Sequence, residues 1–161
     1  MIDDIAPAPG PASQYGMRFT VGDHSARHVR RILRHYLALW GLPELADDAS
    51  LALTELLGNV HDHVPGRRCG LLIERGPSGL RVEVRDECPA LPVPRRAAPG
   101  EESGRGLALL DAVVHKWGVS RTGGPGKTVW FECRAPGAGP GAGPGVAPPG
   151  TLGAPAPGQA R

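Results

Sequence analysis

One stretch, residues 51–64 (LALTELLGNVHDHV), constrains the fold of this chain more than any other. Its leucines and valines recur at helical spacing, which predicts a helix with one buried side. Gly58 and Asn59 are poor mid-helix residues, because glycine costs about 1 kcal/mol relative to alanine and asparagine competes for backbone hydrogen bonds. The polar residues gather on the side opposite the leucines: Glu55, Asn59, Asp62 and His63. Considered alone, such a polar stripe is more often a solvated helix face than a binding site.

The periodic segments of the chain predict three helices and five strands in all. Helical spacing of apolar residues indicates helices over residues 26–40 and 44–64, and a third that opens at 103–106. Short or alternating apolar runs indicate strands over residues 17–21, 69–75, 80–86, 117–121 and 128–133. The last four strands are expected to form two hairpins. This order predicts an α+β fold of two layers, with a mixed, mostly antiparallel sheet and the helices on one face.

The two ends of the chain differ in composition from its centre. Residues 1–14 are rich in proline and alanine without a period, and 15 of the 27 residues in 135–161 are glycine or proline. Such segments bury too little apolar surface to offset the entropy of ordering. We therefore expect one domain over residues 15–134 between two disordered tails. The proline-rich stretch 89–102 is predicted to be a long loop inside that domain.

Charge and cysteine content argue against several functional classes. The net charge is +2, so the composition gives no reason to expect a nucleic acid or an anionic membrane as a partner. No apolar run is long enough to span a bilayer, and the N-terminus lacks the basic and apolar segments of a secretion signal. The three cysteines, Cys69, Cys88 and Cys133, form no CxxC pair, which favours a reduced, cytoplasmic protein.

Three familiar site motifs fail on spacing or context. The GKT at residues 126–128 is not a phosphate loop, because Arg121 stands where glycine is needed and a strand follows instead of a helix. His61 and His63 are too close together for the zinc pair of HExxH. No GxSxG nucleophile elbow occurs in the sequence.

Three separated blocks remain as candidates for chemistry. The first is Glu55 and Asn59, a carboxylate and an amide one helical turn apart that can share a hydrated divalent cation or orient a nucleophile. The second is Asp86 at a strand end, which can accept a hydrogen bond from an exocyclic amine. The third is Gly104 and Gly106 at a helix start, where free N–H groups and the helix dipole favour phosphate.

In this order, with a lid-like loop between the second and third, the blocks resemble the ATP site of the GHKL superfamily. This is the Bergerat fold shared by gyrase, heat-shock chaperones and histidine kinases. The match is closer to the small bacterial anti-sigma-factor serine kinases and their stand-alone ATP-binding relatives. ELLGNVHDH (55–63) resembles their N box, VRDECPALP (84–92) their first glycine box and SGRGLALL (103–110) their second. The resemblance covers residues 19–134.

The resemblance implies a role for each matching residue. Asn59 would ligate a Mg²⁺ ion that bridges the phosphates of ATP, and Glu55 would be the general base that activates a serine hydroxyl. Asp86 would accept a hydrogen bond from the adenine amino group, and Thr128 would support the adenine end. The other residues implied to line the nucleotide are His63, Cys88, Leu91, Gly104, Arg105, Gly106 and Leu107.

The resemblance therefore implies an ATP- and Mg²⁺-dependent serine/threonine protein kinase of the anti-sigma-factor type. Its partners would be a small antagonist protein, a sigma factor or both, and a homodimer is left open. One departure favours a different class: the first glycine box is commonly DxGxG, whereas Asp86 is followed by ECPA. A side chain at Cys88, either a small pocket residue or a redox-sensitive thiol, would reduce nucleotide affinity. The alternative is a non-catalytic, nucleotide-dependent module that switches binding partners.

Overall fold

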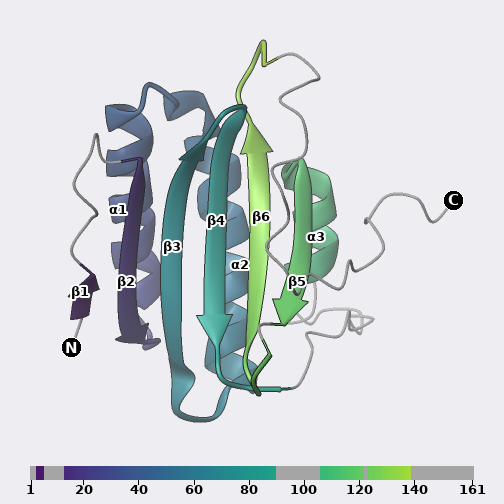
Figure 1. Ribbon diagram of the computed structural model, residues 1–161. Coiled ribbons are helices and arrows are strands. Elements are labelled where there is room, and N and C mark those ends of the chain that lie inside the picture. The colour runs from purple at the N-terminus through teal and green to yellow at the C-terminus, as the bar shows by residue number, and fades with distance from the viewer. Residues whose placement is uncertain (1–2, 6–12, 90–105, 122, 139–161) are drawn as a thin grey trace, which may run out of the picture.

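The described part of the chain folds into two layers, an antiparallel sheet and a layer of helices (Figure 1). The computed structural model describes residues 3–5, 13–89, 106–121 and 123–138. The strands, in the sheet order β1-β2-β3-β4-β6-β5, are β1 (Asp3–Ile5), β2 (Gln14–Thr20), β3 (Arg68–Gly76), β4 (Gly79–Asp86), β6 (Lys127–Arg134) and β5 (Lys116–Arg121). The helices are α1 (Ser25–Leu39), α2 (Ala46–His63) and α3 (Gly106–Val113), with short 3₁₀ turns at Pro43–Leu45 and Pro65–Arg67. None of the described helices is long and apolar enough to cross a bilayer.

The α+β fold predicted from the sequence is confirmed, including both hairpins and the placement of the helices on one face. The N-terminal boundary differs from the prediction. A tail is predicted over residues 1–14, whereas β1 pairs with β2 and β2 begins at Gln14. A three-residue strand is too short to show a period, so the pattern could not reveal β1. Residues 139–161, most of the predicted C-terminal tail, lie outside the described residues.

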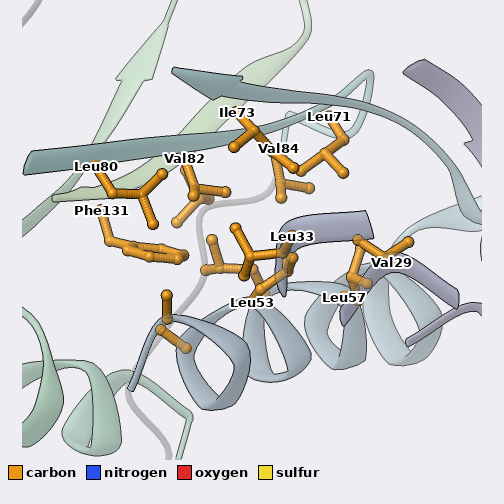
Figure 2. Close-up of a cluster of buried hydrophobic side chains, with 14 of the residues drawn as sticks. Val29, Leu33, Leu53, Leu57, Leu71, Ile73, Leu80, Val82, Val84 and Phe131 are labelled. Carbon is orange, nitrogen blue, oxygen red and sulfur yellow. The ribbon is translucent and has the colours of Figure 1, made fainter. Parts of the chain in front are cut away.

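The core lies between α2 and the middle of the sheet (Figure 2). Leu53 and Leu57 of α2 face Ile73, Val82 and Phe131 of three neighbouring strands, and none of these five side chains is more than 1% exposed. Full burial of such a side chain contributes about 1.5–3 kcal/mol. The other apolar residues predicted on this side of the helix are buried as well: Leu56, Val60 and Val64. Packing therefore fixes how α2 is rotated, and with it where the polar residues of the helix lie.

Candidate functional site

Outside its buried side, α2 carries two half-buried polar side chains that have no partner among the described residues. Glu55 and Asn59 lie one helical turn apart, and both are half-buried. Neither side chain makes a hydrogen bond or an ion pair with another described residue. Burial raises the pKa of Glu55 above its ordinary value of 4.5, because desolvation disfavours the charged carboxylate. His63 lies one turn further along and is exposed. The helix thus presents a carboxylate and an amide oxygen that are free to contact a ligand.

Asn59 fits a magnesium ion that is held mainly by phosphates. Mg²⁺ in nucleotide sites keeps several waters and takes one or two oxygen ligands from the protein, and an amide oxygen belongs to the hard donors it prefers. In the part of the chain that the structure describes, no group of three His, Cys, Asp or Glu side chains could hold a metal ion by itself. A cation at α2 would therefore take most of its ligands from water and a bound phosphate compound.

A buried ion pair lies at the end of β4. Every second side chain of β4 faces the helices: Leu80, Val82, Val84 and then Asp86. The carboxylate of Asp86 therefore lies in the interior. The register pairs Asp86 with Lys127 of β6, and Lys127 Nζ donates to Asp86 Oδ1 at 2.9 Å. The Asp86 and Lys127 side chains are only 3% and 6% exposed. Lys127 therefore neutralises a carboxylate that would otherwise be an uncompensated buried charge.

Asp86 also organises the chain that follows β4. Its Oδ1 accepts a second hydrogen bond from Cys88 N–H at 2.8 Å, and Lys127 Nζ donates to Cys88 O at 3.1 Å. Within the described residues, Asp86 Oδ2 accepts no hydrogen bond. Cys88 Sγ lies 3.9 Å from His63 O at the end of α2. The ends of β4 and α2 therefore meet, and Figure 1 shows both at the same end of the molecule.

Residues 19–133, well over half of the chain, match the family model of the histidine kinase-like ATPase domain. The chain belongs to this family. An uncharacterized protein of Streptomyces coelicolor is 44% identical to this ATPase domain protein over 75 residues, which are 44% of the chain and 71% of that relative. The superfamily predicted from the sequence is confirmed, and the matched range includes α2 and the Asp86–Lys127 pair.

The third block of the ATPase domain is described only in part. α3 begins at Gly106 and packs against α2, so this helix start belongs to the same layer as the polar residues of α2. Leu91, Gly104 and Arg105 lie outside the described residues, as does the side chain of Leu107. The assignment of these residues to the phosphates and the nucleotide pocket stays a prediction.

Thr128 lies on the face of the ATPase-domain sheet opposite to Asp86. The register pairs Thr128 with Arg85 and Ser120, whose side chains point away from the helices, whereas Lys127 shares the face of Asp86. The predicted adenine end would need Thr128 beside Asp86, but the two side chains lie on opposite faces of the sheet. The residue beside Asp86 is Lys127. Sequence reasoning missed Lys127 because GKT was weighed only as a phosphate loop. The alternation of β6 could have found it, because Lys127 lies two and four residues before the buried Val129 and Phe131 and so shares their face.

A close approach of two strands in the ATPase domain requires a glycine at position 126. A Cβ on Gly126 would lie 2.6 Å from Asp86 O and 3.3 Å from Glu87 Oε2. The first of these distances is too short for any side chain, so the backbone would have to shift. Residues 87–90, where the family pattern has glycines, contain none. The contact between β6 and the end of β4 therefore depends on Gly126.

Proposed function

We propose that this histidine kinase-like ATPase domain is a regulatory protein that binds Mg·ATP and transfers its γ-phosphoryl group to a serine or threonine hydroxyl of a partner protein. The observation that carries the proposal is that the end of α2 meets the segment after the buried Asp86, where Cys88 Sγ lies 3.9 Å from His63 O. In this proposal Asn59 would be the metal ligand, Glu55 the base and Asp86 the acceptor for a nucleobase. The resemblance to anti-sigma-factor kinases supports a small antagonist protein or a sigma factor as the partner.

At the base end, Asp86 would accept a hydrogen bond from the amino group of adenine. Lys127 and Cys88 N–H both donate to Oδ1, so Oδ2 is the oxygen left for the base. A buried acceptor without a donor is costly, which favours a base that carries an exocyclic amine over one that lacks it.

At the phosphate end, Asn59 would hold the Mg²⁺ ion and the start of α3 at Gly106 would offer N–H groups. When bound, Mg²⁺ would neutralise charge on the phosphate oxygens. Phosphoryl transfer depends mainly on positioning and charge neutralisation. Asn59 and the N–H groups of α3 therefore need a fixed position and no chemical reactivity of their own. Helical hydrogen bonding fixes Asn59, and the packing of α2 into the core fixes the helix.

Glu55 supports an enzyme over a pure binding module. A carboxylate whose pKa is raised toward the working pH is a better general base than an ordinary one, and Glu55 has this property through burial. It would take the proton of the attacking hydroxyl one turn away from the metal ligand Asn59. The second candidate function is a nucleotide-dependent binding module without catalysis. It is favoured by Cys88, whose side chain stands where the family pattern gives the nucleotide room.

Asn59→Ala is expected to weaken the binding of Mg·ATP by about tenfold or more, because it removes the protein ligand of the metal. The fold should be retained, since the Asn59 side chain has no partner among the described residues and alanine is the better helix former. The measurement is calorimetric titration with ATP, once with Mg²⁺ and once with EDTA.

The control for this experiment is Asp62→Ala, an exposed polar position on the same helix whose carboxylate, within the described ranges, pairs with the neighbouring His61 alone. It should bind Mg·ATP as wild type does. In EDTA, wild type and Asn59→Ala should bind ATP equally. Equal affinity of wild type and Asn59→Ala for Mg·ATP would show that the metal assignment is wrong.

A further inference from the structure

Lys127 is the only buried cationic side chain in the part of the chain that the structure describes. We infer that it is a positioning residue for base recognition: by engaging Asp86 Oδ1 it leaves a single oxygen, Oδ2, to read the exocyclic amino group of a purine. This inference rests on the proposed nucleotide binding and assigns a residue that the motifs of the ATPase domain did not include. Three observations support it: the hydrogen bonds of the carboxylate, the donor geometry of lysine and the position of Cys88.

The carboxylate of Asp86 is held in one orientation. Oδ1 accepts from Lys127 Nζ at 2.9 Å and from Cys88 N–H at 2.8 Å, so a rotation that exchanges the two oxygens would break both bonds. The two side chains are only 3% and 6% exposed, so little solvent competes with the two donors for Oδ1. A buried acceptor held in this way is selective, because Oδ2, which has no partner among the described residues, faces one direction only.

The lysine side chain suits this task better than an arginine would. The chain has two lysines, Lys116 and Lys127, among its 18 lysines and arginines. A guanidinium forks and tends to bind both oxygens of a carboxylate, whereas an ammonium is a point charge that can bind one of them. Lysine at position 127 therefore neutralises Asp86 and still leaves Oδ2 for a ligand.

Lys127 also fixes the chain beside the base. Its Nζ donates to Cys88 O at 3.1 Å, so one ammonium group holds both the carboxylate and the backbone that follows it. Residues 87–90 contain no glycine. In the described part of this segment, Lys127 of β6 holds the backbone of Cys88, and Arg121 of β5 donates to Pro89 O. The ammonium group of Lys127 would therefore not touch a bound base; it would position Asp86 and Cys88, which do.

The test compares ATP with purine riboside 5′-triphosphate, in which hydrogen replaces the 6-amino group. Wild type should bind ATP about 10- to 100-fold more tightly than the analogue, the factor expected for a hydrogen bond to a charged group. Lys127→Met removes one of the two donors that hold the carboxylate in place, and Lys127→Arg engages both of its oxygens. Both variants should bring the ratio of the two affinities close to one, mainly by weakening ATP. Lys116→Met, the same change at an exposed lysine, should keep the wild-type ratio.

Equal losses for ATP and the analogue in the Lys127 variants would overturn the inference, because they would show a structural role only. Wild-type affinity for both nucleotides in these variants would overturn it as well. Lys127→Arg retains the positive charge, so it decides the question if Lys127→Met does not fold. If wild type binds neither nucleotide, the proposed function itself is wrong; if wild type binds both but the variants keep its ratio, the inference about Lys127 alone is wrong.

Discussion

Lys127→Met should lower the free energy of unfolding by about 3–5 kcal/mol, because removing one partner of a buried ion pair leaves the other as an uncompensated charge. The Asp86 side chain is 3% exposed, so water cannot replace the missing ammonium group in the folded state. The hydrogen bond from Lys127 to Cys88 O is lost as well. Urea denaturation followed by circular dichroism measures the change.

The matched control is Arg34→Met. Arg34 Nη2 also lies 2.9 Å from a carboxylate oxygen, Asp47 Oδ1, but these two side chains are 50% and 91% exposed. Exposed pairs contribute about 0.2–1 kcal/mol, so the control should cost no more than that. The double variant Asp86→Asn/Lys127→Met removes both buried charges and should be more stable than Lys127→Met alone. Equally small losses for the two single variants would contradict the account of the buried pair.

Glu55→Gln should slow phosphotransfer to the partner protein by about 10²–10⁴-fold, the usual contribution of a general base. Binding of Mg·ATP should change only a few-fold, because glutamine has the same shape and Glu55 does not hold the nucleotide. Since burial raises the pKa of Glu55, the wild-type rate should fall as the pH drops through a value above 4.5, where the base becomes protonated. The variant should not show this fall.

The measurement is transfer of radiolabelled phosphate from ATP to a small antagonist protein, with nucleotide binding measured in parallel. If wild type transfers phosphate and Glu55→Gln does so equally fast, Glu55 is not the base. If wild type is inert toward every antagonist and sigma factor offered, the nucleotide-dependent binding module replaces the kinase as the function.

Periodicity was sufficient to predict where the candidate residues of α2 lie, whereas their roles came from the family resemblance. The same leucines that define the buried side of the helix determine where Glu55 and Asn59 lie, so a 3.6-residue pattern carries both the fold and this half of the site. Asp86 was also accessible to sequence reasoning, because it ends a strand with clear alternation. Both positions depend on local features, and local spacing suffices to place them.

The role of Lys127 could not be read from local spacing. It depends on the pairing of β4 with β6, two strands separated by more than 40 positions in the sequence, and a shift of one residue would have placed Thr128 beside Asp86 instead. The predicted role of Thr128 came from the family resemblance and involved no strand register. Strand β1 was missed for another reason, because three residues show no period.

Titration of Asp86→Asn with ATP tests the central claim most directly, that Asp86 forms the base end of a nucleotide site next to α2. Cys88 N–H and Lys127 both donate to Oδ1, so the asparagine must place its carbonyl oxygen there and its NH₂ group at the position of Oδ2. The adenine amine would then face a donor, and ATP affinity should fall by about 10- to 100-fold. GTP, which has a carbonyl oxygen in place of that amine, should lose less. With the fold verified by circular dichroism, an unchanged affinity for ATP, or equal losses for ATP and GTP, would contradict the account.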